Sequence, residues 1–440
     1  MVSVKNIRKK AVAVTLAAVL AGTTLVAQAA AVRPANDPYL SWLATAYNGG
    51  SAHYGWNTTT NQLTNLPAVA NLKVAAPGGQ APFAAMVGGA NHIVADSQAD
   101  WDTTQNGTNF LITAFPSIAH STTTDVWTGS GHGKFDTSTN ATTGNENGWT
   151  IMQNAGVNVV LDKPEQHSAD WYPNTEVDDY LDPNDVTVVP AGPMATPSAI
   201  KTAAQILADV FGDPSSHLTT FDSDYDSYLS AAHTIAANYY STHTQKKKVL
   251  YIHGVNTTAG TVRLMSSPPA NGSNDYDGYI LSDYISSSSY LESDNITDDW
   301  ISAQGLAQGE DGNLYVSYAD FNTIISTYQP DVVIFNTSGN ESTIDNTVLT
   351  GTAKTWYDAN IYYSGSTRYS AAPIGIYNEA LRSPDTALAP AWLAYAIFRS
   401  DVSGNYTLST LKSQATTFYS DVYGFSISSS QLSTMFSHLN

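Results

Sequence analysis

The stretch APIGIYNEALRSPDTALAPAWLAYAIF, residues 372–398, carries the densest set of structural signals in the chain. It opens with a short extended piece, because Pro373 favours an extended predecessor and Gly375 lets another backbone approach closely. The tripeptide Ser-Pro-Asp at residues 383–385 then predicts a helix start. It supplies a hydroxyl N-cap, a proline at the first helical position and a carboxylate in the first turn.

A helical pattern follows this start. Leu388, Trp392 and Tyr395 recur at helical spacing and define one apolar face. Pro390 interrupts the pattern, since an interior proline costs about 3 kcal/mol and kinks a helix. We therefore expect the helix to restart at Pro390.

This stretch resembles the C-terminal part of the ABC-transporter substrate-binding proteins for iron-siderophores, haem and cobalamin. Their pattern there runs roughly P-x-G-x-Y-x-W-x-x-R-S-P-E-x-x-L-x-x-x-W-L-A. The chain matches the pattern at Pro373, Gly375, Tyr377, Arg382, Ser383, Pro384, Leu388, Trp392, Leu393 and Ala394.

The chain departs from the pattern at two positions, with Glu379 in place of tryptophan and Asp385 in place of glutamate. The first departure removes an aromatic ligand contact, and the second keeps the charge. The residues Phe418-Tyr419 and Tyr423-Gly424 resemble the closing F-Y-x-x-x-Y-G of the same family. The likeness covers about residues 320–436 and is faint over residues 70–250.

The resemblance implies an α/β fold of two Rossmann-like lobes joined by a long interdomain helix, with a ligand cleft between the lobes. It also implies an extracytoplasmic solute-binding protein without catalysis of its own. Such a protein captures an iron(III)-chelate of the siderophore type, or a related ligand such as haem, cobalamin or an oxyanion. It delivers that ligand to an inner-membrane ABC permease with its ATPase. No cofactor is expected besides the ligand, and we expect a monomer.

Residues 1–29 have the three parts of an export signal. A basic segment containing Lys5 and Arg8 precedes the apolar run 11–20, and Ala27-Gln28-Ala29 forms an A-x-A cleavage site. The apolar run is shorter than a bilayer-spanning helix requires. The chain contains no cysteine, which excludes disulfides, thiolate metal ligands and a lipid-modified anchor. We therefore expect a free periplasmic protein.

The composition is strongly acidic. The chain has 18 Lys+Arg against 38 Asp+Glu, and loss of the leader's four basic residues leaves 14, a formal charge of −24. This balance argues against nucleic acid and anionic membranes as partners. With 42% hydrophobic residues, the chain is long enough to bury a large core.

Hydrophobic patterns divide the chain into a leader and three further parts. Continuous apolar runs at 72–76, 92–95 and 157–161 predict buried parallel strands in an N-terminal α/β lobe, residues 36–196. A Ser/Thr/Asn/Gly-rich tract at 121–148 predicts a long polar insertion. Apolar residues with helical spacing predict a helical connector at 197–244, whose longer helix runs from Phe221 to Thr244.

The remaining residues, 245–440, predict a C-terminal α/β lobe. Val249 to Ile252 is predicted as a strand that ends at His253-Gly254, and Val332 to Phe335 as the strand that follows a helix over 321–328. A strand is also expected at 361–363. The helices expected last are Leu408 to Tyr423, stopped by Gly424, and Ser430 to His438.

The sequence lacks the common catalytic motifs. The glycine-rich run 129–134 lacks the spacing of a phosphate loop, since Phe135 follows its lysine. No G-x-S-x-G or H-E-x-x-H motif occurs, and no metal ligands or catalytic residues are predicted. The alternative to a binding protein is a secreted, hydrolase-like α/β enzyme with its active site in the polar insertions.

Ligands of open α/β sheets bind at the carboxyl ends of the strands. The loops expected there offer aromatic faces and arginines, which suit a bulky, oxygen-rich chelate. These loops are 78–83, 115–128 and 162–172 in the first lobe and 253–263, 336–341 and 377–382 in the second. For Arg382 a structural ion pair with Glu379 or Asp385 is an equally valid interpretation. The candidate ligand contacts are Trp171, Tyr172, His253, Arg263, Asn336, Tyr377 and Arg382.

Overall fold

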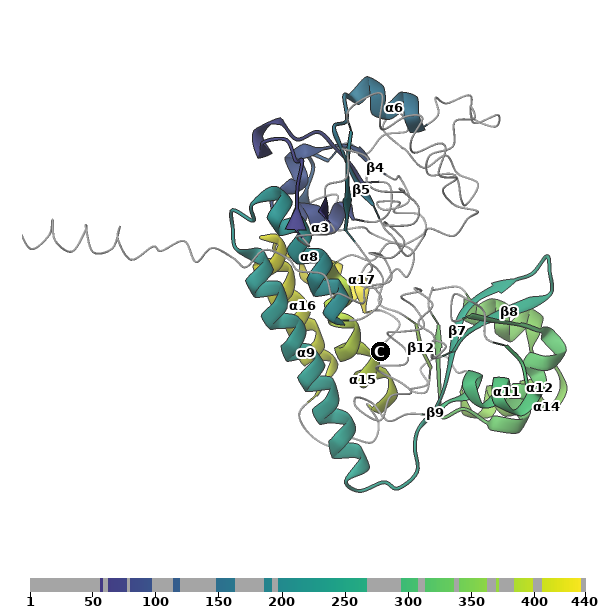
Figure 1. Ribbon diagram of the computed structural model, residues 1–440. Helices are drawn as coiled ribbons and strands as arrows, with labels where there is room; N and C mark the ends of the chain where they lie inside the picture. Colours follow the sequence, from purple (N-terminus) through teal and green to yellow (C-terminus); the bar gives the residue numbers. More distant parts are fainter. Residues whose placement is uncertain are drawn as a thin grey trace, which may run out of the picture.

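Figure 1 shows two α/β lobes that lie beside a group of long helices. The computed structural model describes the following residues of the 440: 56–57, 62–76, 80–96, 114–118, 148–162, 186–191, 197–266, 294–307, 313–335, 340–361, 369–371, 384–398 and 406–436. The predicted leader and residues 121–147 of the polar tract lie outside these ranges.

The first lobe is built on a four-stranded sheet with the order β4-β3-β5-β6, in which all neighbours are parallel. Its strands are β3 (Val74–Ala76), β4 (Ile93–Asp96), β5 (Val159–Asp162) and β6 (Thr187–Pro190). Small and β-branched apolar residues fill these strands, as expected for a parallel sheet covered on both faces. The three strands predicted from apolar runs are therefore confirmed.

Short elements complete this lobe. Helix α3 (Ala81–Met86) follows β3 and is buried along its whole length, and helix α6 (Gly148–Ala155) precedes β5. The remaining short elements are the antiparallel pair β1 (Trp56–Asn57) and β2 (Gln62–Leu63) and the 3-10 turns η1 (Val69–Asn71) and η2 (Gly89–His92).

The connector consists of helices α8 (Pro197–Phe211) and α9 (His217–Tyr240). Gly212 turns the chain between them in a left-handed conformation, with φ of 81°. The Asp213 carboxylate then accepts hydrogen bonds from the backbone N–H groups of His217 and Leu218, at 3.0 and 3.1 Å. These bonds satisfy donors that the first turn of α9 leaves unpaired.

Helix α9 confirms the long helix predicted from spacing and begins four residues earlier than Phe221. Its core-facing side carries Leu218, Phe221, Tyr225, Tyr228, Ala232, Ile235, Ala236 and Tyr239. The helix ends at Tyr240, before the predicted Thr244, and the ring of His243 stacks on that of Tyr239 with ring centroids 4.1 Å apart.

The second lobe contains a mixed sheet with the order β10-β8-β7-β11-β12, and β9 lies beside the start of β7. Strands β7, β11 and β12 are parallel, whereas β8 runs antiparallel to both β7 and β10. The strands are β7 (Lys248–Asn256), β8 (Thr261–Met265), β9 (Asp294–Asn295), β10 (Asn313–Ser317), β11 (Val332–Phe335) and β12 (Tyr369–Ala371). The predicted strand at 361–363 is wrong at Ile361, which directly follows helix α14.

The two faces of this sheet belong to different cores. Leu250 and Ile252 join a cluster with side chains of the helices on one face. Those helical elements are α11 (Ile296–Gln304), α12 (Tyr318–Tyr328), η6 (Ile344–Val348) and α14 (Gly351–Asn360). The short helix α13 (Asn340–Thr343) directly precedes η6. Val249 and Tyr251 face the other way and join a cluster that runs through α9 into the first lobe.

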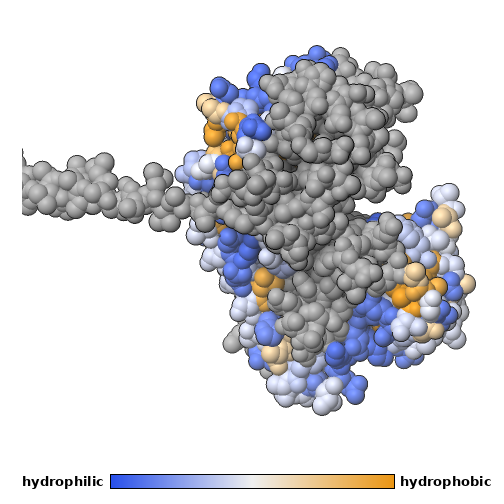
Figure 2. All heavy atoms as spheres, viewed as in Figure 1, coloured by the Kyte–Doolittle hydropathy of each residue, from blue (hydrophilic) through white to orange (hydrophobic). Residues whose placement is uncertain are grey.

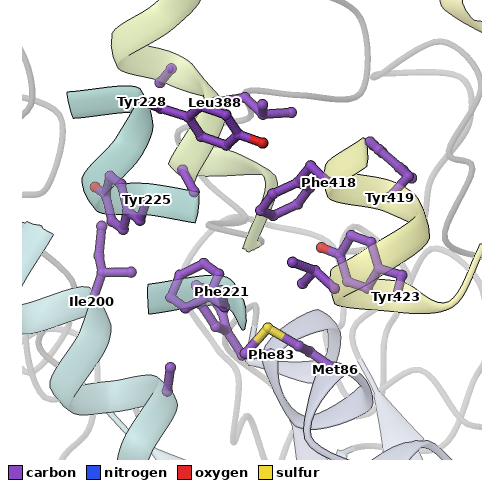
Figure 3. Close-up of a cluster of buried hydrophobic side chains, with 14 of the residues drawn as sticks. Phe83, Met86, Ile200, Phe221, Tyr225, Tyr228, Leu388, Phe418, Tyr419 and Tyr423 are labelled. Carbon is purple, nitrogen blue, oxygen red and sulfur yellow. The ribbon is translucent and has the colours of Figure 1, made fainter. Parts of the chain in front are cut away.

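Three of the last described helical elements pack on α9 of the connector, namely η7 (Pro384–Leu388), α15 (Ala389–Phe398) and α16 (Leu408–Tyr423). The last one, α17 (Ser429–Met435), packs on α16. Helices α15 and α16 both lie against α9, and α16 also contacts α3. Figure 3 shows this junction, where Phe418 and Tyr423 of α16 meet Phe221 of α9 and Phe83 of α3. The lobe boundaries at 36–196 and 245–440 stay predictions.

The sequence predicted a helix with a single apolar face in this region, and helix α15 differs from that prediction. Nine of its ten residues are buried, so it is surrounded by protein on nearly all sides. The predicted restart near Pro390 is confirmed, because a 3-10 turn ends at Leu388 and α15 begins at Ala389. Proline is tolerated there because the first helical turn has no partner for its N–H groups.

Candidate ligand-binding site

The parallel pairing of β7, β11 and β12 in the second lobe ends at one level. Ile252 of β7 pairs with Phe335 of β11, and Phe335 pairs with Ala371 of β12. His253 follows Ile252 directly and therefore lies at the edge where ligands of open α/β sheets bind.

The sequence wrongly predicted that the strand ends at this point and that residues 253–263 form a loop. Strand β7 continues to Asn256 and forms a hairpin with β8, so His253 and Arg263 lie on adjacent strands. The hairpin forms because Asn256 Oδ1 accepts a 2.9 Å hydrogen bond from the N–H of Ala259, and Gly260 adopts a φ of 66°. Both features favour a tight turn.

His253 is the extra residue of a β-bulge, since the pairing shifts between Ile252 and Gly254. Bulges re-aim side chains, and this one leaves the imidazole buried next to Arg263. The Nη1 of Arg263 lies 2.8 Å from Nε2 of His253. Because arginine has only donors, His253 Nε2 must be the acceptor.

The other imidazole nitrogen then carries the proton. His253 Nδ1 lies 3.1 Å from the sulfur of Met265, which is a weak acceptor. A neutral His253 therefore fixes the position of the Arg263 guanidinium at the carboxyl edge of the sheet.

An aromatic ring that was not predicted from the sequence completes this cluster. The Cζ atom of Arg263 lies 5.8 Å from the centroid of the Tyr315 ring, and these two residues are direct cross-strand partners. Tyr315 is 59% exposed. The alternation of Leu314, Tyr315 and Val316 is the signal that would have placed Tyr315 on the opposite face from its buried neighbours.

The other five candidate contacts lie outside the described residues. They are Trp171, Tyr172, Asn336, Tyr377 and Arg382. The structure brings His253 and Arg263 together, and the role of all seven in ligand binding stays a prediction.

A buried carboxylate lies between η7 and α16. Asp385 is fully buried and accepts hydrogen bonds of 2.5 Å from the hydroxyls of Tyr419 and Tyr423. Burial raises the pKa of the Asp385 carboxyl to about 7, although the two tyrosine hydrogen bonds act in the opposite direction.

The described part of the surface in Figure 2 carries both hydrophilic and hydrophobic residues. Among the coloured residues of this face, blue and pale ones surround small orange patches. Across the described ranges, no three His, Cys, Asp or Glu side chains are grouped so that they could hold a metal ion. None of the described helices is both long and apolar enough to cross a membrane.

Comparison with solved structures assigns the fold. A periplasmic solute-binding protein from Veillonella parvula superimposes with a TM-score of 0.54 at 17% identity, covering 83% of this chain and 91% of that one. An ABC transporter solute-binding protein from Sulfurospirillum deleyianum gives 0.54 at 13% identity, covering 86% and 97%. The chain has the fold of the periplasmic solute-binding proteins. This confirms the predicted class, two α/β lobes joined by a long helix.

A third solved structure with this binding-protein fold is CeuE from Helicobacter pylori with Ni(II) bound. It gives a TM-score of 0.50 at 12% identity, covering 83% of this chain and 94% of that one. No family model and no curated protein sequence matches the chain. At these identities the likeness concerns the binding-protein fold alone.

Proposed function

We propose that this chain is the extracytoplasmic solute-binding component of an ABC importer and that it binds its ligand without catalysis. The observation that carries the proposal is α9, a continuous 24-residue helix between two α/β lobes. Solved proteins that share this arrangement over most of their length are solute-binding proteins.

The ligand we propose is an iron(III)-chelate of the siderophore type, or a related metal complex. Arg263 over Tyr315 supports this choice, because a guanidinium pairs with oxygen-rich groups and an exposed ring packs on a bulky chelate. The metal-bound state of the structurally similar CeuE points the same way. Trp171, Tyr172, Asn336, Tyr377 and Arg382 are proposed as further contacts.

The proposal includes export to the periplasm and delivery to an inner-membrane permease with its ATPase. The basic, apolar and A-x-A segments of residues 1–29 support cleavage near Ala29. Sequencing the N-terminus of the exported protein tests this part, and a chain that still begins at Met1 would contradict it.

Binding is tested on the protein purified after export. Native mass spectrometry with iron(III)–desferrioxamine B, iron(III)–citrate, haemin and cyanocobalamin should detect a one-to-one complex with at least one probe. Each probe should be recovered unchanged after dissociation. A probe that is consumed would instead support the secreted enzyme.

A further inference from the structure

Arg263 and Tyr315 lie together on one face of the second lobe's sheet, and solvent reaches both. Their neighbours along β8 and β10, which include Val262, Leu264 and Leu314, pack with the helices on the other face. Side chains alternate between the two faces of a sheet, so Arg263 and Tyr315 lie on the face without those helices. Tyr315 is 59% exposed and Arg263 is partly exposed. A ligand can therefore contact both side chains from solvent.

Arg263 brings a positive charge to a very acidic protein. It is the one arginine among the described ranges, and the whole chain has 18 Lys+Arg against 38 Asp+Glu. The imidazole of His253 and the ring of Tyr315 are both uncharged, so they position the guanidinium without neutralising it. An arginine held in this way binds a carboxylate or another planar oxyanion through paired N–H groups.

His253 is the group most sensitive to the charge state of Arg263. It is 8% exposed, and its Nε2 lies 2.8 Å from Nη1 of Arg263. A proton on Nε2 would place two positive groups in contact and would remove the acceptor of this hydrogen bond. An anion bound to Arg263 offsets the repulsion, and the N–H group that His253 releases can donate to the anion instead. Both penalties therefore fall when an anion binds.

The other titratable groups near His253 come from β7 itself and from the elements packed closely against it, β8, β9, β11, α11 and α13. The four residues of β11 are apolar. Besides His253 and Arg263, the titratable residues of these elements are Lys248, Tyr251, Asp294, Asp298, Asp299 and Glu341. Asp294 pairs with Lys248 at the start of β7, and Asp299 interacts electrostatically with both. Glu341 of α13 is therefore the carboxylate whose contribution needs a separate test.

We propose that Arg263 binds an anionic group of the ligand and that His253 takes up a proton as it binds. This inference rests on the proposed function. By thermodynamic linkage, proton uptake on binding means that the affinity for an anionic chelate rises as the pH falls. A neutral or cationic chelate does not relieve the repulsion between Arg263 and a protonated His253, so its affinity should not rise. The pair therefore selects anionic chelates, and selects them more strongly in acid.

Three ferric chelates with the same iron core separate charge from shape. Iron(III)–desferrioxamine B is a cation through its terminal ammonium group, its N-acetyl derivative is neutral, and its N-succinyl derivative is an anion. Carboxylates and amines keep these charges between about pH 6 and pH 8. Calorimetric titration of the exported protein in buffers of different ionisation enthalpy should detect proton uptake with the N-succinyl derivative alone. Its affinity should be about threefold or more higher at pH 6 than at pH 8.

His253→Gln keeps an acceptor for Arg263 but cannot take up a proton in this range. This variant should still bind the anionic chelate, without proton uptake and without the rise in affinity. Arg263→Gln should lose the preference for the anionic chelate. The matched control is His243→Gln, since His243 is exposed and stacks on Tyr239 beyond the end of α9. That variant should take up the proton as the wild type does.

Nitrogen-15 NMR of the wild type follows the same proton without a substitution at the buried position. The diamagnetic gallium(III) complex of N-succinyl desferrioxamine B should shift the imidazole resonances of His253 toward their protonated values at pH 6. Resonances that stay at their neutral values would overturn the inference.

The remaining outcomes separate this inference from the proposed function. Proton uptake that persists in His253→Gln, or that disappears in Glu341→Gln, would assign the proton to another group and overturn the role of His253. Equal affinities for the three chelates at both pH values would overturn the selection of anions and leave the proposed function intact. Binding of haemin or cyanocobalamin without any of the three chelates would do the same. If no probe binds, the proposed function fails and this inference fails with it.

Discussion

The hydroxyl of Tyr419 donates a 2.5 Å hydrogen bond to the carboxylate of Asp385, across 34 residues of sequence. Tyr423, one turn further along α16, donates a second bond to the other carboxylate oxygen. All three side chains are buried within an otherwise apolar cluster. The position of η7 against α16 therefore depends on one polar group at the base of the C-terminal helices.

Stability should depend on pH through Asp385. The pKa of this carboxyl is about 7 in the folded protein, compared with an ordinary value of 3.8. The folded state therefore binds the proton more tightly than the unfolded chain. The resulting stabilisation is complete below about pH 4 and is lost as the pH rises to about 7.

Asp385→Asn removes this titration. The wild type should lose stability relative to the variant as the pH rises. The difference between their free energies of unfolding, wild type minus variant, should be about 2–3 kcal/mol smaller at pH 8 than at pH 5. Urea denaturation at the two pH values measures the difference. A difference that stays constant, or that grows with pH, would contradict the assignment.

Tyr423→Phe should lower stability by about 1.5–3 kcal/mol at pH 8, where its hydroxyl donates to a charged acceptor. The tyrosine hydrogen bonds hold the pKa of Asp385 down. Without one of them, the pH-dependent loss of stability should occur at higher pH. The control is Tyr406→Phe, whose hydroxyl donates to the neutral amide of Gln414 at 2.5 Å. That change should cost about 0.5–1.5 kcal/mol and leave the pH range unchanged.

Local patterns predicted the elements that a single physical signal specifies. Helix α9 followed from apolar residues at a period of 3.6, and α16 from a similar pattern that ends at Gly424, whose φ is 62°. The buried strands β5 and β11 followed from short apolar runs. These features depend on residues that are close in sequence.

Features that depend on distant residues were not predicted. Asp385 was interpreted as a first-turn carboxylate stabilised by the helix dipole, whereas it is buried and paired with tyrosines of α16. The hairpin of His253 and Arg263 was missed because a polar residue and a glycine resemble the end of a strand. In the structure, strand β7 continues through a β-bulge at His253 and pairs with β8.

Arg263→Ala should weaken chelate binding by about 1–3 kcal/mol, since it removes a charged donor that His253 orients. Arg263→Lys keeps the charge but loses the planar guanidinium, so only part of the affinity should return. Lys412→Ala removes one positive charge from α16 and serves as the control, with no change expected. Equal affinities of the wild type and Arg263→Ala in calorimetric titration would remove Arg263 from the site.

Helix α9 should limit how far the lobes move when ligand binds. A continuous helix cannot absorb a large change in backbone angles without losing hydrogen bonds, and α15 and α16 pack against this one. Small-angle scattering of the wild type should therefore show almost no compaction on addition of the chelate. Strong compaction would contradict the assignment of α9 as a rigid connector.

Thr234→Pro provides the complementary test. Thr234 is exposed in the last third of α9, so the substitution disturbs the helix without opening the core. Proline removes a backbone hydrogen bond and should lower the free energy of unfolding by about 3 kcal/mol. It should also enlarge the difference in radius of gyration between the free and ligand-bound states. Thr234→Ala removes only the side-chain bond to the carbonyl of Ser230 and should change stability by less than about 0.5 kcal/mol. If both variants scatter like the wild type in both states, the continuity of α9 does not control the distance between the lobes.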